Sequence, residues 1–434
     1  MGGSHIGNPD SIHNLSTYLS KNSKRKFVVV SAIPGLLELI DNEIENIFTK
    51  EVQSGNLTDR LLAFFTLNSR NEVSEAYLEL SEKLINLLHG ISLIGDYSDA
   101  LKDQVLSYSE NLSVEILKSN WTENGVPATV LKPEDIQLAA TPDFGNATFI
   151  SVNSGKISDL EDGIYLIPGS YGITAAGKIA RAGYTSADYT AAFLTRALNA
   201  QKLELWDLDK DFHRAATSIV NHPPVIKRLT YSEASELAYF EHYSFHPRTV
   251  EPLEHEHIPI QVISSASFDG IVKTTINTET YIESQIIKSV ACTDDISLLK
   301  LNGPGVGLKP GILARVTTEL NDSGINIKSV ITSQTSINFI LNKENGDKAL
   351  HLIQKLGFSS VKEISVVKDL SLIGIVGHGI QQNYGVSAKI FTAVANNKIN
   401  VVLSGSAASD LVSYLVVHKG DKRKSVQEIY KAFF

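Results

Sequence analysis

Two short stretches near the start of the sequence carry groups that can hold an anion or a small polar ligand. Gly2-Gly3-Ser4 can bring backbone N–H groups together on a phosphate, because glycines allow close approach. The alternatives are a disordered start of the chain and a cloning remnant. Ser31 ends the apolar run "KFVVVSA" (26–32), and ligands of α/β proteins bind where strands end. Ser31 can equally cap the helix that follows.

Two acidic residues lie in helical patterns. Glu110 belongs to "YSENLS" (108–113), and Asp188 belongs to "GYTSADYTAAF" (183–193), where small residues precede the first turn of a helix. Either carboxylate bears on chemistry if it faces a ligand. The plain alternatives are a solvated helix face for Glu110 and stabilisation of the helix dipole for Asp188. Taken singly, each pattern favours the plain alternative.

The surrounding sequence predicts the elements that must position these residues. Short apolar runs at 26–32, 163–172, 202–209 and 257–264 predict buried strands. Between them, 185–200 has one apolar face and predicts a helix. Such alternation of strands and helices favours an α/β layered domain.

The last 150 or so residues contain an internal repeat with an offset of 74 positions. Residues 296–303 align with 370–377, and each copy predicts strand, helix, strand, strand, helix. Only the first copy continues into a further strand, at 361–368. A spare strand-like run at 284–293 precedes the first copy, and we expect it to fold back and complete the second. The two small units would then be interlocked.

Composition limits the class of protein. The 434 residues are 43% hydrophobic and carry a net charge of −9 without a long basic run, which argues against nucleic-acid binding. Cys292 is alone, which fits a reducing compartment. No apolar run approaches a membrane span and no signal peptide is evident, so we expect a cytoplasmic protein. The twelve histidines lack zinc-like spacing, and no metal site is predicted.

In this order, these pieces resemble the aspartate kinase family, an amino-acid-kinase domain followed by two ACT domains. "MGGSH" matches the end of the family's opening K-F-G-G-[ST]-S, and "VVVSAIPGLLELI" is similar to V-V-S-A-x-x-G-x-T-N-x-L. "VLSYSENLSVEIL" looks like V-L-S-x-G-E-x-L-S. "LTYSEASELAYFEHYSFHPRT" is close to I-S-Y-D-E-A-x-E-L-A-x-F-G-A-K-V-L-H-P-R-T. The resemblance covers nearly the whole chain.

The resemblance implies a fold and a domain division. It implies a three-layer, carbamate-kinase-like α/β domain over 1–283, followed by tandem ferredoxin-like ACT domains over 284–434. We place the first ACT domain at about 304–369. The second would span about 370–434 and be completed by 284–303. ACT domains commonly pair through exposed sheet edges, so a homodimer is expected.

The resemblance also implies an activity: ATP-dependent phosphorylation of L-aspartate to 4-phospho-L-aspartate with Mg²⁺, in lysine, threonine and methionine biosynthesis. Asp188 and Glu110 would be the catalytic residues, and Ser31, Glu110 and Arg181 would meet the substrate. The nucleotide would be bound by Gly2, Gly3, Ser4, Asp207, Asp209 and Phe212.

The ACT domains imply an amino-acid effector near the first unit's strand–helix loop and second strand. The candidate effector residues are Lys309, Gly311, Ile312, Leu313, Asn326, Ile327, Ser333 and Gln334. Lysine-sensing members of the family carry acids where this chain has Lys328 and Gln334. A cationic effector is therefore not expected.

Several family positions differ in this sequence. The family lysine that precedes the Gly-Gly loop is not part of this sequence. The stretch "IPGSYGITAAGKIARAGYTSADYTAA" resembles the family segment that ends T-L-G-R-G-G-S-D-Y-T-A, and Tyr184 stands where that segment has its arginine. Leu37 stands for a threonine and Tyr243 for a lysine. Arg181 is a candidate substitute for the missing arginine. Two other functions stay open: phosphorylation of a different small acid, and a catalytically impaired homologue that senses or binds a small molecule.

Overall fold

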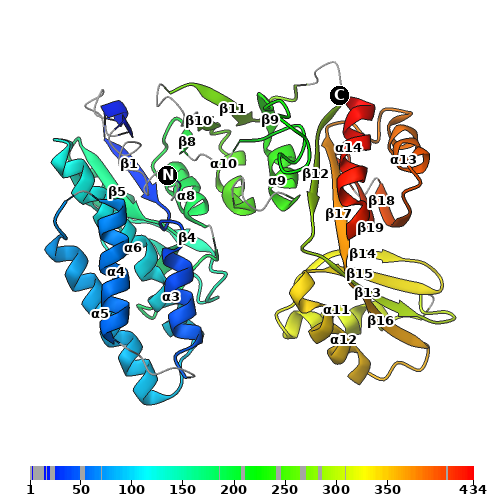
Figure 1. Cartoon of the computed structure of the whole chain (residues 1–434), viewed down its shortest axis with the longest axis horizontal. Helices are drawn as coiled ribbons and strands as arrows, with labels where there is room; N and C mark the ends of the chain where they lie inside the picture. Colours follow the sequence, from blue (N-terminus) through cyan, green and yellow to red (C-terminus); the bar gives the residue numbers. More distant parts are fainter. Residues whose placement is uncertain are drawn as a thin grey trace. The chain divides into compact units, whose positions relative to one another are not determined.

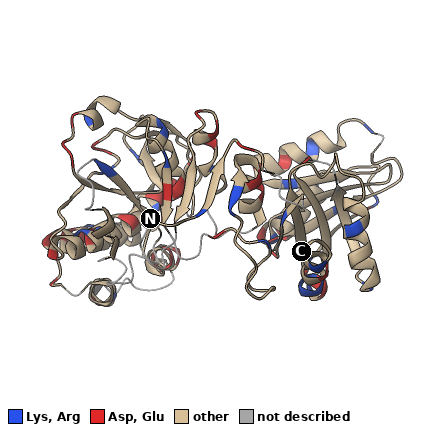
Figure 2. Cartoon of the chain, turned by 90° about the horizontal axis from the view of Figure 1, so that it is seen from above, with Lys and Arg blue, Asp and Glu red and all other residues tan. Residues whose placement is uncertain are grey.

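The computed structural model describes residues 2, 14–15, 17–19, 25–48, 54–69, 71–184, 186–206, 211–240, 246–263, 270–281, 286–307, 309–406 and 409–434. The chain divides into two compact units (Figure 1). Unit 1 comprises Met1–Phe212, Lys227–Ala238 and His242–Glu279. Unit 2 comprises His213–Ile226, Tyr239–Glu241 and Thr280–Phe434. Lys and Arg are interspersed with Asp and Glu in the elements of both units (Figure 2).

Unit 1 contains a parallel sheet with helices on both faces. Its strands are β1 (Lys26–Val30), β5 (Ile164–Pro168) and β2 (Ala128–Val130), with β5 in the middle. Successive residues of β1 and β5 face opposite ways, as strand geometry requires. Val30 and Leu166 join one apolar cluster, whereas Val29 and Ile167 join another. The result is the predicted three-layer α/β domain.

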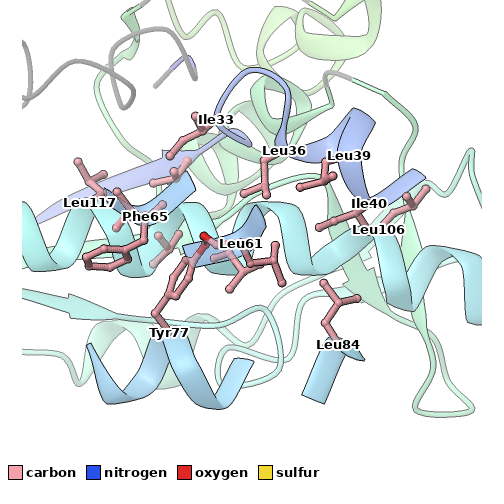
Figure 3. Packing of buried hydrophobic residues seen from close by; sticks show 14 of the residues in the cluster. Ile33, Leu36, Leu39, Ile40, Leu61, Phe65, Tyr77, Leu84, Leu106 and Leu117 are labelled. Atoms are coloured by element: carbon pink, nitrogen blue, oxygen red, sulfur yellow. Dashed lines mark hydrogen bonds between the residues drawn. The ribbon is translucent and has the colours of Figure 1, made fainter. Parts of the chain in front are cut away.

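The first cluster is built from four helices, α3 (Leu36–Glu45), α4 (Ser54–Asn68), α5 (Glu75–Ile94) and α6 (Asp99–Glu123). Figure 3 shows leucine, isoleucine and aromatic side chains of these helices converging. Tyr77 is fully buried there, and its hydroxyl donates to the carbonyl oxygen of Leu61 at 2.7 Å. Burial of one such leucine contributes roughly 1.5–3 kcal/mol, so this cluster is the main anchor of α6.

The second cluster contains α8 (Ala187–Ala197), which packs on β1 and on β8 (Leu203–Trp206). β8 is the edge of a second sheet, in the order β8, β10 (Ile260–Ile263), β11 (Val272–Asn277), β9 (Arg228–Thr230). A small sheet of β4 (Phe149–Ser151), β3 (Ala139–Ala140), β6 (Tyr171–Ile173) and β7 (Ile179–Arg181) completes the main framework of unit 1.

Helix α9 (Tyr231–Phe240) shows how local sequence fixes an element in this region. Thr230 and Glu233 form a reciprocal capping box. The Glu233 carboxylate accepts from the Thr230 N–H at 2.9 Å, and the Thr230 hydroxyl accepts from the Glu233 N–H at 3.1 Å. The short helices η1 (Pro247–Thr249), α10 (Glu251–Glu254) and α7 (Ser154–Ser158) lie elsewhere in unit 1.

The C-terminal repeat appears in unit 2 as two four-stranded sheets. The first is ordered β14 (Ile327–Thr332), β15 (Ser336–Leu341), β13 (Ser297–Asn302), β16 (Glu363–Val367). The second is ordered β12 (Ile287–Thr293), β17 (Leu370–Gly377), β19 (Val412–His418), β18 (Val401–Ser406). Helices α11 (Ile312–Asp322) and α12 (Gly346–Lys355) accompany the first sheet, and α13 (Val386–Asn396) and α14 (Lys422–Phe433) the second.

The interlocked arrangement is confirmed, because β12 precedes the first sheet in the chain yet pairs antiparallel with β17 of the second. The boundary drawn at 303 is wrong for one strand. We expected all of 284–303 to complete the second unit, but β13 pairs with β15 and β16. The reason is that Leu299 and Leu301 pack in the apolar cluster of the first sheet.

The linear boundary at 283 also differs from the division of the structure, since 213–226 and 239–241 belong to unit 2. Ala215 forms a parallel bridge with Val290, and the hydroxyl of Ser289 donates to the carbonyl oxygen of His213 at 2.7 Å. The ring of Phe240 lies against Gly374, where a Cβ would come within 2.4 Å of it. These segments are held by the second sheet.

Candidate active site

Helix α6 carries two carboxylates on one buried face. Asp103 and Glu110 are seven residues apart, or about two helical turns, so they point the same way. Their exposed fractions are 4% and 2%. The helix begins at Asp99 after Ser98, whose side chain accepts from the Leu101 N–H, and it packs against β5, β2 and β7. Two acids are thus held away from water, where each requires a partner.

Glu110 finds its partner in Arg181, at the end of β7. The two form a bidentate ion pair, with Nη1 at 2.8 Å from Oε2 and Nη2 at 3.0 Å from Oε1. Both side chains are only 3% exposed. The hydroxyl of Ser109 lies 2.8 Å from Oε2 of Glu110 and 2.7 Å from the carbonyl oxygen of Leu106, and its one proton is shared between these two acceptors. Such fork-to-fork geometry is the strongest form of carboxylate recognition by arginine.

Asp103 holds the backbone of the same arginine. Its Oδ2 accepts from the N–H of Arg181 at 2.7 Å and from the N–H of Gly145 at 2.8 Å. Burial raises the pKa of the Asp103 carboxyl above its ordinary value, although both N–H groups and the charge of Arg181 act in the opposite direction. Helix α6 therefore binds Arg181 at two places: Asp103 accepts from the main-chain N–H of Arg181, and Glu110 accepts from its guanidinium.

Ser31 follows β1 and is half-buried. Two residues later, the N–H of Ile33 donates to the hydroxyl of Ser113 at 2.9 Å, and that hydroxyl donates to the carbonyl oxygen of Ser109 at 2.7 Å. Ser113 lies one helical turn beyond Glu110. The segment after β1 is therefore fastened to α6 within a turn of the Glu110–Arg181 pair.

Asp188 lies in the first turn of α8 and is 3% exposed. The turn after β5 approaches this end of the helix closely, because a Cβ on Gly169 would lie 2.6 Å from the Cβ of Ala187. The N–H of Ser170 donates to the hydroxyl of Thr190 at 2.9 Å. Ser186 stands at the N-cap position but its hydroxyl donates to the Gly183 carbonyl oxygen.

Tyr184, in the loop before α8, faces helix α3. Its hydroxyl donates to the carboxylate of Asp41, and Lys102 lies 3.1 Å from the other Asp41 oxygen. Burial, reinforced by that carboxylate, raises the pKa of Tyr184 to about 12. Tyr184 thus remains a neutral phenol near neutral pH, engaged by an acid, and supplies no positive charge.

The expected nucleotide residues are only partly within the described residues. Gly2 donates its N–H to the carbonyl oxygen of Trp206, at the end of β8, at 2.8 Å. Phe212 is 1% exposed, so its ring is enclosed by protein. Gly3, Ser4, Asp207 and Asp209 lie outside the described residues.

The candidate effector residues divide between the two ends of β14. One group surrounds the loop after β13: the Gly307 N–H donates to the Gln334 carbonyl oxygen at 3.1 Å, which places Ser333 and Gln334 beside the segment that leads to Lys309 and Gly311. Asn326 and Ile327 lie at the opposite end, where Ile327 pairs with Leu341. Ile312 is 4% exposed within the apolar cluster, whereas Leu313 is 40% exposed.

Comparison with known protein families decides the class. The model of the amino acid kinase family matches residues 1–264, and models of ACT domains match 291–355 and 373–433. The chain belongs to the amino acid kinase family. With its two ACT domains, this family member has the arrangement of aspartokinases.

Named relatives agree with that arrangement. Aspartokinase of Geobacillus stearothermophilus is 26% identical over 408 residues, covering 92% of this chain and 94% of the relative. The bifunctional aspartokinase/homoserine dehydrogenases of Buchnera aphidicola and Haemophilus influenzae are each 26% identical, and the matches cover 100% and 80% of this chain. These matches cover only 56% and 44% of those two longer relatives, so the chain spans about half their length.

Solved structures show the same fold. Escherichia coli aspartokinase III in complex with aspartate and ADP has a TM-score of 0.83 at 22% identity, covering 100% of this chain and 98% of that one. The same enzyme in complex with lysine and aspartate has a TM-score of 0.77, also at 22% identity. The expected fold is therefore confirmed for the kinase domain and for the two ACT domains.

Within this family member, the residue that sequence reasoning missed is Asp103. The sequence feature that could have indicated it is its position seven residues before Glu110, on the same helix face.

Among the described residues, none of the helices combines the length and apolar character that a membrane span requires. Within the same described parts, no three or more His, Cys, Asp or Glu side chains are grouped as metal ligands.

Proposed function

We propose that this chain transfers the γ-phosphoryl group of MgATP to the carboxylate of a small acid, with L-aspartate as the acid suggested by the names of its relatives. The observation that carries the proposal is the buried Glu110–Arg181 pair, one helical turn from the segment that follows β1. It sets a carboxylate-binding guanidinium near the end of a parallel strand, where α/β proteins bind ligands.

The reaction needs no proton transfer. A carboxylate oxygen of the acid attacks the γ-phosphorus, a new P–O bond forms, and the bond from that phosphorus to the β–γ bridging oxygen breaks as ADP leaves. Mg²⁺ enters with the nucleotide, held mainly by phosphate oxygens, as is usual for this ion. Catalysis then consists of positioning and of compensating negative charge.

The roles of individual residues follow from that chemistry. Ser31 and Arg181 bind and orient the acid, Glu110 holds the guanidinium of Arg181 in place, and Asp188 orders the site from the first turn of α8. The phosphates lie against Gly2, Gly3 and Ser4, and the rest of the nucleotide lies towards Asp207, Asp209 and Phe212. Through the loop bearing Lys309 and the hairpin at Gln334, the ACT pair would bind an amino acid that regulates the transfer.

A second candidate function is a catalytically impaired homologue that senses a small molecule through its ACT domains. A specific observation favours it: the position at which the family motif has an arginine is Tyr184, whose hydroxyl is bound to Asp41. Loss of a positioned cation typically costs about 10²–10³ in rate. Such a protein would act by binding rather than by catalysis.

Trapping of acyl phosphate with hydroxylamine separates the two candidates. The full chain is incubated with MgATP, hydroxylamine and each of several small acids, and the hydroxamate is quantified. We expect ATP-dependent hydroxamate from at least one acid, and a loss of about 10²-fold in Asp188→Asn because the site is less well ordered. Arg196→Ala, on the exposed side of α8, is the matched control and should keep the activity. No hydroxamate from any acid would leave the impaired homologue as the function.

A further inference from the structure

Arg181 changes what Glu110 can bind. A carboxylate that meets a free amino acid recognises its ammonium group, since that is the amino acid's only cation. Here both oxygens of Glu110 are engaged by the chain itself, through the two bonds from Arg181 and the bond from Ser109. The pair is electrically neutral and almost completely buried. An ammonium group at this place would meet a guanidinium rather than a free carboxylate.

The side chain of Arg181 is held in this conformation. Its N–H is fixed by Asp103, and its carbonyl oxygen accepts from the N–H of Ala147 at 2.8 Å. Moving the guanidinium away would leave the buried carboxylate of Glu110 without its charged partner, which is strongly unfavourable. The closed pair is therefore part of the framework rather than one of several side-chain positions.

The same arginine still has donors to offer. A guanidinium carries five N–H groups, and the bidentate pair with Glu110 uses one on each terminal nitrogen. Among the described residues, the other side-chain N–H groups of Arg181 have no hydrogen-bond acceptor. They are donors for an anionic or hydroxyl oxygen. Ser31 lies two residues before Ile33, whose N–H donates to Ser113 one helical turn beyond Glu110.

We infer that Arg181 is a specificity-determining residue that makes this site select a small dicarboxylic acid without an amino group. This inference rests on the proposed function, because it names the acid that receives the phosphoryl group. One carboxylate of the acid accepts from Arg181, and the other attacks ATP as described above. Succinate is the suitable probe, because it differs from L-aspartate only in lacking the α-amino group.

Calorimetric titration of the full chain in the presence of MgADP tests the inference. Wild type should bind succinate at least about tenfold more tightly than L-aspartate, equivalent to about 1.4 kcal/mol. Arg181→Thr releases Glu110 and should abolish or invert that preference. Arg196→Thr, on the exposed side of α8, is the matched control and should leave it unchanged. Should Arg181→Thr fail to fold, the uncharged pair Glu110→Gln/Arg181→Gln should show no preference between the two acids.

Three results would overturn the inference: tighter or equal binding of L-aspartate by wild type, an unchanged preference after replacement of Arg181, or no binding of either acid. The proposed function fails in a different way. If wild type prefers succinate but gives no succinyl hydroxamate with MgATP, the selectivity stands and the phosphoryl transfer does not.

Discussion

Each of the two units contains an ion pair between a carboxylate and a buried cationic side chain. The two pairs differ in how far water can reach the carboxylate. In unit 1, the side chains of Glu110 and Arg181 are each 3% exposed and are joined by two hydrogen bonds of 2.8 and 3.0 Å. In unit 2, Lys328 is 5% exposed, but its partner Asp295 is 38% exposed and lies 3.4 Å away. The ammonium of Lys328 also sits 5.1 Å from the ring centre of Tyr239.

The two carboxylates therefore depend on their partners to different degrees. Water can hydrate Asp295 if Lys328 is removed, whereas the buried carboxylate of Glu110 would be left without either water or a charged partner. The pair in unit 1 is therefore a fixed part of the candidate active site. The pair in unit 2 joins β14 to the crossover after β12 and tolerates change. Both tryptophans, Trp121 and Trp206, lie in unit 1, so their fluorescence reports that unit alone.

The largest expected effect is that of Arg181→Met. It leaves a buried, unpaired carboxylate at Glu110, and breaking a buried pair in this way costs about 3–5 kcal/mol. The free energy of unfolding is measured by urea titration of the full chain, followed by tryptophan fluorescence. Arg196→Met, at an exposed site, is the control and should change it by less than about 0.5 kcal/mol. A loss below 1 kcal/mol for Arg181→Met would show that Glu110 is not isolated from water.

Asp103→Ala should have the next largest effect. It leaves the N–H groups of Arg181 and Gly145 without their acceptor, and an unsatisfied buried group costs about 1–3 kcal/mol. Asp103→Asn keeps an acceptor oxygen and should retain most of the stability. The same fluorescence titration measures both. Equal losses for the two variants would contradict the assignment of Asp103 as an acceptor for the backbone.

Lys328→Met should change little, which sharpens the contrast with unit 1. The methionine keeps the apolar contact with Tyr239, and Asp295 becomes hydrated. We expect a change within about 1 kcal/mol, as for partly exposed pairs. Hydrogen exchange of the amides in β14 and β15 measures it in the full chain. A loss as large as that of Arg181→Met would mean that the two pairs are equivalent.

The smallest expected effect is on the stability of unit 2 at acid pH, and it depends on Asp294. Burial alone would raise the pKa of Asp294, but hydrogen bonds from Lys422 and Ser371 outweigh it and lower the pKa. A lowered pKa means that Asp294 stabilises unit 2 above its ordinary pKa, and that this contribution is lost as the pH falls through the lower, folded value. Asp103 behaves oppositely, because its raised pKa favours folding as the pH falls.

Asp294→Asn should therefore reduce the acid sensitivity of unit 2 below about pH 4, by up to about 1 kcal/mol. Calorimetric unfolding of the full chain between pH 3 and pH 6 measures the difference from wild type. The assigned role of Asp294 fails if wild type and variant lose stability in parallel across that range.

The sequence pattern was sufficient for the repeat and insufficient for the pairing of charges. Helices α11 and α13, and strands β14 and β18, start and end 74 residues apart, because the apolar periodicity that defines them is local. The Glu110–Arg181 bonds join residues 71 apart in the sequence. Nothing in the spacing of either residue indicates the other, since only the packing of α6 against β7 brings them together.

The candidate effector residues illustrate the same limit. They belong to one loop and one strand, but Asn326 and Gln334 lie at opposite ends of β14, so the set does not form one cluster. Asp103 was missed because a carboxylate in a helix looks the same in sequence whether it is hydrated or bound to backbone N–H groups. Its burial depends on β7 and on the loop at Gly145.

A crystal structure of the full chain with MgADP and succinate would show which group of the site faces the acid. We predict that Arg181 stays bidentate to Glu110 and donates one of its other N–H groups to a carboxylate of succinate. A structure in which Glu110 has separated from Arg181 and faces the ligand alone would contradict it.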